Sequence, residues 1–569
     1  MILNTISSEK REMNALPKRS NPDAVSVKAE GAVYTPAELA RFIARRLLKA
    51  ATLPEAGKIQ VLDPAMGDGA LLDALLGELD PKTRARCVVH GYDLDPQALS
   101  IGSQRLSENH PQAEHTFYTS DFLEVANGHR YDLVIANPPY VRTQVLGATQ
   151  AQVLAEKYGL TGRVDLYYPF LLAIASVLAP TGSAGVITSN RFLTTKSGQE
   201  VRKSLLEKFR IRQVFDLGDT KLFDAAVLPA ITIAQGTSSP ASKPFFSSIY
   251  ATTEQARQVA TSPLEALEAT DGEVVAVNGL HYRVRHGLLD NGGEDEGIWR
   301  IGTQAGDEWL STVQSRTWNT FSSIGKIRVG VKSTADKVFI RADWNVTQGE
   351  PELLMPLLTR HCAQRYRALQ PKNPKHRKRI LYPHTTKNGK RAAVDLDQHP
   401  ISKAYLESHR EQLEGRKYVI TAGRQWYEIW VPQDPSAWKY PKLVFPDISE
   451  KPSFWMDLDG SIVNGECYFL RSENRSDPDL LWLALAVANS SFIEIFYDHC
   501  FNNKLYAGRR RWITQYVEKF PLPDPNKPIS RKIIDSAKRL YELTPSTQAD
   551  EISQELNNLV WEAFGLLPE

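Results

Sequence analysis

The sequence lacks any run of about 18 apolar residues, the length that a membrane-spanning helix requires. Residues 1–23 are polar, carry both signs of charge and have no apolar core of the kind found in a secretory signal. Cysteine is scarce: Cys87, Cys362, Cys467 and Cys500 are scattered, and no two form a Cys-x-x-Cys pair. These absences argue against a membrane protein, a disulfide framework and a metal site, and they predict a cytoplasmic protein.

An excess of charge is also missing, since 68 basic residues face 66 acidic ones, and net charge therefore predicts nothing about a polyanionic partner. The distribution of charge is more informative. Residues 360–379 contain many basic residues and no acidic one, and they form a first basic cluster. Arg509, Arg510 and Arg511 form a second. Such concentrations suit a polyanion, although either cluster alone is equally consistent with a solvated surface loop.

The first half of the chain alternates short apolar runs with helical patterns. Residues 58–62, 87–92, 131–136 and 184–188 have the composition of buried strands, and helix-like stretches such as 70–79 and 166–178 lie between them. This alternation predicts a parallel sheet with helices on both faces. The second half is richer in tryptophan and turns, which favours a separate α+β domain. We place the predicted boundary between 1–245 and 246–569.

A tight loop follows the first predicted strand, with the sequence Asp63-Pro64-Ala65-Met66-Gly67-Asp68-Gly69. The two glycines allow a sharp turn and a close backbone approach to a ligand. The loop has neither the Gly-Lys-Ser/Thr of a phosphate-binding loop nor a G-x-G-x-x-G pattern. It suits a ligand with a sulfonium and an amino acid moiety, near which Asp63 offers a carboxylate.

Acidic residues then recur at successive predicted strand ends. Asp93, followed by Leu94, can accept hydrogen bonds from ribose hydroxyls, and Asp121 can accept from an adenine amino group beside Phe122. Each Asp alone is more often a turn residue or a helix cap. Upstream, Thr35 precedes a helix in which Thr35, Pro36 and Glu38 form a predicted capping box.

The most specific pattern is a buried strand that runs into Asn137-Pro138-Pro139-Tyr140. The prolines stiffen this turn and remove two N–H donors, so it presents acceptors, namely the Asn137 side-chain oxygen and the Pro138 carbonyl. Two acceptors suit an amino group whose lone pair is delocalised into a ring, because holding both hydrogens localises that lone pair for attack on a methyl group. Tyr140 supplies a flat face for stacking.

In this order the motifs resemble the amino-group DNA methyltransferases, in particular the gamma-type adenine-N6 enzymes similar to the Taq methyltransferase of restriction–modification systems. The resemblance implies a Rossmann-like S-adenosylmethionine methyltransferase domain with a mixed seven-stranded sheet and a C-terminal α+β target-recognition domain. Short patterns at residues 330–339, 426–430, 441–444 and 489–490 are similar to landmarks of the latter.

The same resemblance implies roles for individual residues. Asn137 and Pro138 would hold the adenine amino group, Pro139 would contact both ligands, and Tyr140 and Phe223 would stack on the two faces of a flipped base. A plain core role for Phe223 is about equally consistent with its surroundings. The residues expected to bind S-adenosylmethionine are Thr35, Asp63, Pro64, Ala65, Met66, Gly67, Asp93, Leu94, Asp121, Phe122 and Pro139.

Because adenine N6 lies inside the duplex stack, the chemistry requires base flipping. Double-stranded DNA is therefore the expected partner, the clusters at 365–379 and 509–511 are candidates for phosphate contacts, and a cognate restriction endonuclease is left open. A protein-glutamine or RNA amino-group methyltransferase is the main alternative, although it would not explain the long second half. Cytosine-C5 methylation is disfavoured because no cysteine follows a proline.

Overall fold

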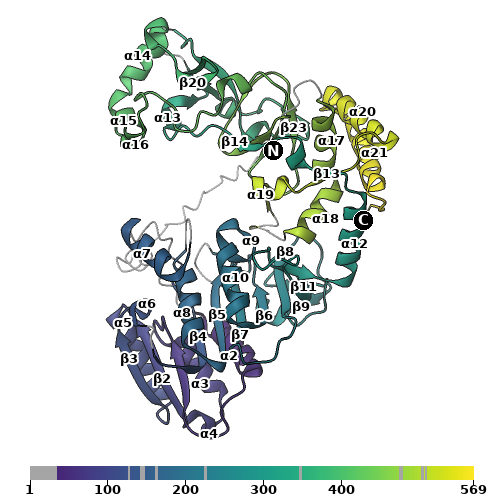
Figure 1. Ribbon diagram of the computed structural model, residues 1–569. Coiled ribbons are helices and arrows are strands. Elements are labelled where there is room, and N and C mark those ends of the chain that lie inside the picture. The colour runs from purple at the N-terminus through teal and green to yellow at the C-terminus, as the bar shows by residue number, and fades with distance from the viewer. Residues whose placement is uncertain are drawn as a thin grey trace, which may run out of the picture.

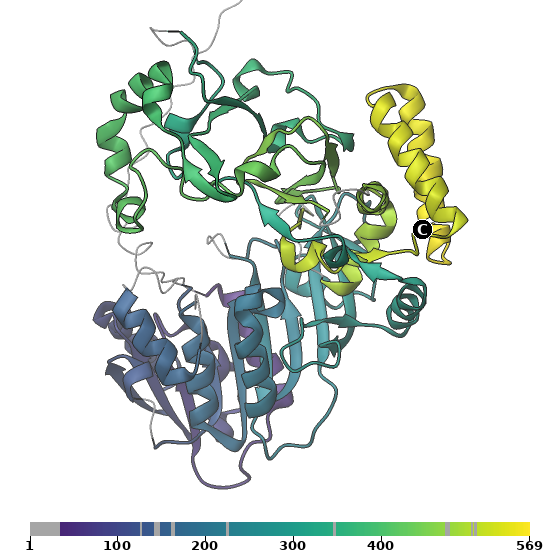
Figure 2. The same ribbon diagram turned by 45° about the horizontal axis from the view of Figure 1, so that its top comes forward.

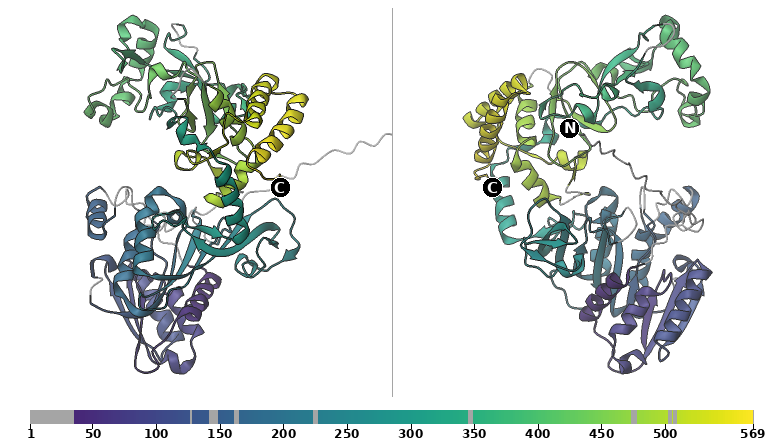
Figure 3. Two further views of the ribbon diagram at one scale, coloured as in Figure 1. Left: turned by 45° about the vertical axis from the view of Figure 1, so that its right-hand side comes forward. Right: turned by 180° about the vertical axis from the view of Figure 1, so that it is seen from behind.

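The chain folds into two lobes, one above the other in Figure 1, in a computed structural model. The lower lobe, purple to teal, holds the first half of the chain, and the upper lobe, green to yellow, holds the second half. Figure 3 shows the same division in an oblique view and from behind. The structure describes residues 35–125, 128–140, 148–160, 165–222, 227–344, 349–472, 478–501, 505 and 509–568.

A single sheet forms the centre of the lower lobe. Its first seven strands have the spatial order β3-β2-β1-β4-β5-β7-β6, in which β3 to β5 are parallel and β7 runs antiparallel to both its neighbours. The predicted strands are therefore confirmed. The bounds are β1 (Ile59–Asp63), β2 (Cys87–Asp93), β3 (Glu114–Thr119), β4 (Tyr131–Ala136), β5 (Leu178–Ser189), β6 (Arg210–Asp216) and β7 (Pro229–Gln235).

The sheet does not end there, and the prediction of seven strands is too low, since the described strands of this sheet number twelve. Strand β8 pairs with β6, and β11 pairs with β8, so the backbone hydrogen bonds of the expected edge strand are continued by the following segment. The predicted domain boundary at 245/246 falls at the first residue of β8, inside the sheet. The added strands are β8 (Phe245–Ala251), β9 (Gln258–Val259), β10 (Val274–Val277), β11 (Leu280–Asp290) and β12 (Arg300–Gly302).

Helices cover both faces of this sheet, as the alternating pattern predicts (Figure 1). Helices α2 and α3 pack with one face through an apolar cluster that includes Leu39, Ile43 and Leu75, and α8 packs on the other face through Leu171 and Ile174. The helices of this lobe are α2 (Ala37–Ala50), α3 (Ala70–Glu78), α4 (Pro81–Arg84), α5 (Pro96–Asn109), α6 (Phe122–Val125), α7 (Ala148–Tyr158), α8 (Tyr167–Val177), α9 (Arg191–Thr194), α10 (Gln199–Lys208) and α11 (Pro263–Ala266).

Short strands in several small sheets build most of the upper lobe. A five-stranded sheet has the order β14-β25-β21-β23-β17, a four-stranded sheet has the order β15-β18-β16-β24, and β19 forms a two-stranded sheet with β20. The predicted strand at 442–446 is β21. The bounds are β13 (Asn319–Thr320), β14 (Ile327–Val329), β15 (Ile340–Arg341), β16 (Leu354–Leu358), β17 (Tyr366–Arg367), β18 (Arg379–Leu381), β19 (His384–Lys387), β20 (Lys390–Ala393), β21 (Lys442–Pro446), β22 (Ile448–Ser449), β23 (Trp455–Asp457), β24 (Ile462–Val463), β25 (Cys467–Leu470), β26 (Arg510–Arg511) and β27 (Pro521–Leu522).

Helices surround these sheets, and α20 and α21 lie side by side at the outer edge of the lobe (Figure 2). In the described part of the chain, no single helix is long and apolar enough to cross a membrane. Helices α17 and α18 taken together have the length and apolar composition of a membrane span, but their axes are bent by 75° at the break between them. The bounds are α12 (Gln304–Arg316), α13 (Asp336–Phe339), α14 (Pro400–Ser408), α15 (Arg410–Glu414), α16 (Lys417–Thr421), α17 (Asp479–Ala488), α18 (Ser491–Cys500), α19 (Thr514–Val517), α20 (Pro528–Leu543) and α21 (Thr547–Ala563).

Candidate active site

The predicted site residues gather at one edge of the large sheet. Strands β3, β2, β1 and β4 are parallel neighbours, so their carboxyl ends meet at the same edge. Asp63 is the last residue of β1 and Asp93 the last of β2, while Asn137 directly follows β4. The fold thereby brings together segments that are tens of residues apart, at the edge where open α/β sheets bind ligands.

The glycine loop between β1 and α3 makes the predicted tight turn. Gly67 and Gly69 have φ values of 51° and 75°, the left-handed region that favours glycine. The Gly67 N–H donates to Asp93 Oδ2 at 2.8 Å, and the Met66 N–H donates to the Tyr92 carbonyl at 2.9 Å. These bonds tie the loop to the end of β2. The Met66 side chain is buried, so this residue can face a ligand only through its backbone.

Asp63 carries a carboxyl group that is fully buried. Its Oδ1 accepts from the Ala65 N–H at 3.0 Å, and its Oδ2 has no hydrogen-bond partner in the described structure. Burial, reinforced by the charges of Asp93 and Asp68, raises the pKa of Asp63 from 3.8 to about 8. Ionising a buried carboxyl group without a nearby cation costs roughly several kcal/mol in lost solvation. A cationic ligand beside Asp63 would therefore stabilise its carboxylate.

Two further predicted positions differ in exposure. Leu94 is 70% exposed, which leaves its side chain open for apolar contact beside Asp93. Phe122 is buried, and its ring packs against Tyr92 and Phe170. Asp121 accepts from the Leu123 N–H at 2.9 Å, which is the ordinary helix-start role that its position allows.

Asn137 has both ends of its side-chain amide engaged. Its Nδ2 donates to Thr35 Oγ1 at 3.1 Å, and its Oδ1 accepts from the Tyr140 hydroxyl at 2.5 Å. Burial raises the pKa of Tyr140 above its usual range, so the hydroxyl keeps its proton and remains a donor. The oxygen predicted to receive a substrate amine therefore already receives a donor from the same loop, and an amine must share or replace that contact.

The predicted capping box at Thr35 is wrong. Pro36 has extended backbone angles (φ −58°, ψ 142°), helix α2 begins at Ala37, and its N-cap has no side-chain hydrogen bond. The Thr35 hydroxyl instead accepts from Asn137, across about a hundred residues of sequence. The turn before α2 thus holds the Asn137 amide in one orientation, which a local capping pattern cannot reveal.

A cavity of about 400 Å³ lies beside this loop, with Tyr140 in its wall. Asn190 and Asp216 contribute from the ends of β5 and β6, and Arg511 contributes from the upper lobe, so the cavity lies where the two lobes meet. Asn190 Nδ2 donates to Asp216 Oδ1 at 3.0 Å, and the Tyr250 hydroxyl donates to Asp216 Oδ2 at 2.6 Å. Burial raises the pKa of Asp216 to about 6. Phe223, the other predicted stacking residue, lies outside the described residues.

The second basic cluster predicted for phosphate contacts is largely engaged inside the protein. Arg510 donates to both carboxylate oxygens of Asp498, each at 2.8 Å, and also pairs with Glu494, while Arg511 pairs with Asp447. Arg510 therefore takes part in ion pairs within the protein, whereas the sequence predicts a phosphate contact for it. Within the first cluster, Arg379 pairs with Glu350 and Arg365 with Glu494, whereas Lys372 and Lys375 are exposed.

Two known families match separate parts of the chain. The Eco57I restriction-modification methylase family matches residues 88–223, and the TaqI-like C-terminal specificity domain matches residues 338–522. The first match contains the strands that end in Asp93 and precede Asn137. The second lies within the upper lobe.

Known proteins are similar over nearly the whole chain. The type II methyltransferase M.BanIII of Aneurinibacillus aneurinilyticus is 37% identical over 95% of this chain and 98% of its own length. The type II methyltransferase M.BstVI of Geobacillus stearothermophilus is 25% identical over 82% of this chain and 85% of its own length. Among solved structures, the DrdV–DNA complex has a similar fold, with a TM-score of 0.54 and 12% identity over 92% of this chain and 58% of that chain.

Proposed function

Since the chain belongs to the type II restriction–modification DNA methyltransferases of the TaqI-like family, we propose that it methylates N6 of adenine in duplex DNA, with S-adenosylmethionine as the methyl donor. The observation that carries this proposal is the turn at Asn137 and Pro138, which lies at the same sheet edge as Asp63, a buried carboxyl group whose Oδ2 has no hydrogen-bond partner in the described structure.

The cofactor edge fits a cationic ligand. Asp63 Oδ2 is buried without a partner, which suits the ammonium or sulfonium charge of S-adenosylmethionine. The turn at Gly67 leaves the backbone open, Asp93 can accept from ribose hydroxyls, and exposed Leu94 can pack on a planar base. Pro64, Ala65, Asp121 and Pro139 complete the proposed contact set. When bound, the cofactor supplies an electrophilic methyl group.

The catalytic loop acts on the amino group of the base. Asn137 Oδ1 and the Pro138 carbonyl oxygen accept its two hydrogens, and this draws the nitrogen towards tetrahedral geometry as positive charge develops on it. Thr35 keeps the Asn137 amide from turning its nitrogen towards the substrate, since Nδ2 is held by the hydroxyl oxygen. No general base is required, because the proton can leave after the methyl group has moved.

The base must leave the duplex to reach this loop. We propose that it enters beside Tyr140, whose ring stacks on one face, and that Phe223 covers the other face. The cavity between the lobes provides room at the correct sheet edge. We also propose that the catalytic unit ends after β12, near Thr303, because strands β8 to β12 continue its sheet.

The experiment that tests this function is expression in cells that lack DNA methylation, followed by long-read mapping of modified bases. The expected result is N6-methyladenine at one enriched sequence motif. N4-methylcytosine in place of N6-methyladenine would overturn the assignment of the base. Methylation of protein or RNA with unmodified DNA would instead favour the alternative amino-group substrates.

A further inference from the structure

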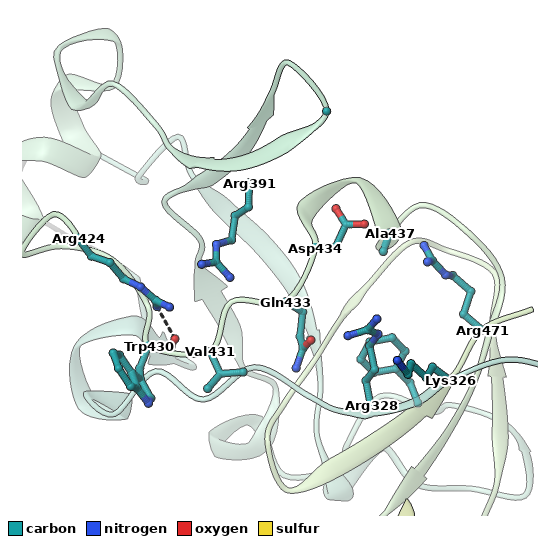
Figure 4. Close-up of a pocket in the computed structure, with 12 residues that line it drawn as sticks. Lys326, Arg328, Arg391, Arg424, Trp430, Val431, Gln433, Asp434, Ala437 and Arg471 are labelled. Atoms are coloured by element: carbon teal, nitrogen blue, oxygen red, sulfur yellow. Dashed lines mark hydrogen bonds between the residues drawn. The ribbon is translucent and has the colours of Figure 1, made fainter. Parts of the chain in front are cut away.

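A strongly basic hollow of about 560 Å³ lies in the upper lobe, far from the catalytic loop in sequence. Five cationic side chains line it. They come from strand β14 and the residue before it, from strand β20, from the loop after α16 and from the residue that follows β25. Figure 4 shows these side chains on different sides of the hollow, with Trp430 among them. The cations are Lys326, Arg328, Arg391, Arg424 and Arg471.

Within the residues that the structure describes, no carboxylate forms a salt bridge with these cations. Asp434 is the acidic residue of the lining, and its carboxylate is engaged locally by the N–H and hydroxyl of Ser436, at 3.0 and 2.8 Å. A concentration of unpaired positive charge in a concave surface creates a potential that attracts a polyanion.

Some of these side chains are held in place before any ligand binds. Arg424 Nη1 donates to the Trp430 carbonyl at 2.5 Å, and its guanidinium lies 4.8 Å from the centre of the Trp430 ring. Arg471 Nη1 is buried without a hydrogen-bond partner in the described structure, an unusual state for a guanidinium nitrogen. The hollow thus combines an anchored cation with a buried donor that needs an acceptor.

The hairpin at the rim has the same character. Its turn, Asn388-Gly389, has positive φ at both residues (53° and 71°), which is the backbone of a tight two-residue hairpin turn. Residues 385–391 are all exposed, include Lys387, Lys390 and Arg391, and contain no acidic residue. The hairpin therefore extends the positive surface beyond the hollow.

We propose that this hollow grips the sugar–phosphate backbone of duplex DNA, so that the upper lobe holds one strand through Arg328, Arg391 and their neighbours. The inference rests on the proposed function in one respect, that duplex DNA is the substrate. The lining offers almost only donors, and phosphate oxygens are acceptors only. The Gln433 Nε2 is already committed to the Val329 carbonyl at 2.8 Å, so an amide that could read adenine is tied to the protein backbone.

The test uses the full-length Arg328→Ala/Arg391→Ala variant and a fluorescently labelled duplex of random sequence. Both side chains are exposed and, in the described structure, neither makes a hydrogen bond or ion pair, so we expect unchanged thermal unfolding. The Kd should rise on the order of tenfold, because two phosphate contacts are lost. The slope of log K against log salt concentration should fall by about 1.8, since each phosphate contact contributes about 0.9.

Two controls make the result specific. Lys49→Ala/Lys82→Ala removes the same charge from exposed positions on α2 and α4, in the lower lobe, and should leave the Kd and the salt slope unchanged. Arg328→Lys/Arg391→Lys should retain most of the binding, because a phosphate accepts either cation, whereas a bidentate guanine contact would be lost.

Equal Kd and equal salt slope for the alanine variant and the wild type would overturn the inference. So would a relaxed methylation motif in mapped DNA, which would make these residues base readers. A wild-type protein that does not bind duplex DNA at all would instead contradict the proposed substrate.

Discussion

The cofactor edge of the lower lobe and the basic hollow of the upper lobe are built in opposite ways. In the lower lobe, each polar residue lies at the carboxyl end of its own strand, and the parallel arrangement of these strands brings Asp63, Asp93 and Asn137 to one edge of the sheet. In the hollow, the cations come from short strands and loops that are spread along the chain between Lys326 and Arg471. The first arrangement can be predicted from motifs that follow one another along the chain. The second cannot, because its residues come together only when the lobe folds.

The two regions also treat charge differently. Among the described residues, Asp63 in the lower lobe is a buried carboxyl group without an ion-pair partner, and the cations that line the hollow of the upper lobe have no carboxylate partner. Each region therefore favours a ligand of opposite charge, a cationic cofactor below and a polyanion above. The cavity with Tyr140 and Arg511 lies between them, where a base extruded from the duplex would meet the methyl donor.

The largest effect is expected at the catalytic loop. Asn137→Ala removes the side-chain oxygen that accepts a substrate hydrogen, so kcat should fall by about 10³-fold or more, the scale found when a preorganised transition-state contact is removed. S-adenosylmethionine binding, followed by calorimetry, should change little because Asp63 and Asp93 remain. Retention of near-wild-type kcat would show that the Pro138 carbonyl or another group suffices.

The next prediction separates structural arginines from ligand-binding ones. Arg510→Ala removes the mostly buried guanidinium that contacts both Asp498 and Glu494, although Glu494 keeps Arg365, and this should lower the free energy of unfolding by about 3 kcal/mol. The urea midpoint should fall, while the salt slope of DNA binding by the folded variant stays unchanged. A reduced salt slope at unchanged stability would return Arg510 to the phosphate contacts that its sequence suggests.

A smaller effect concerns the buried carboxyl group. Because the pKa of Asp63 is about 8 in the folded chain and 3.8 ordinarily, the folded state retains a proton that the unfolded chain releases. Stability without cofactor should therefore fall as pH rises from about 6 to about 8, and Asp63→Asn should flatten this dependence. We expect the melting temperature of the wild type to be roughly 3 °C lower at the higher pH than at the lower pH. An equal pH dependence of stability in the wild type and in Asp63→Asn would contradict a raised pKa of Asp63.

The smallest effect should follow Tyr140→Phe. This change removes the hydroxyl that donates to Asn137 Oδ1 but keeps the ring that stacks on the base. Since the substrate amine takes over the same oxygen, kcat should change less than about tenfold, whereas Tyr140→Ala should cost more through lost stacking. Steady-state rates for the two variants decide this, and equal losses would mean that the hydroxyl, not the ring, is the working part of Tyr140.

Motifs predicted the lower lobe well because its elements are local. An apolar run, a glycine turn and a polar residue at the strand end suffice to place Asp63 and Asn137, and no long-range contact alters that order. The Thr35 prediction failed because Pro36 adopts an extended conformation and frees the hydroxyl to meet Asn137. The predicted number of strands was too low because β8 continues the sheet by pairing with β6. Composition does not indicate such a pairing.

The upper lobe was less predictable for the same physical reason. A run such as Arg509-Arg510-Arg511 is conspicuous in sequence, yet the fold gives Arg510 and Arg511 acidic partners. Arg328, Arg391 and Arg424 are inconspicuous singly and become a site only because separate elements converge. Charge density along the chain is thus a poor guide to charge density in space.

The most direct test of the central claim is a single-turnover reaction of the purified protein with methyl-labelled S-adenosylmethionine and duplex DNA, followed by analysis of the nucleosides. We predict label in N6-methyladenine for the wild type and none above background for Asn137→Ala. Label in another base, or equal label from the two proteins, would contradict it.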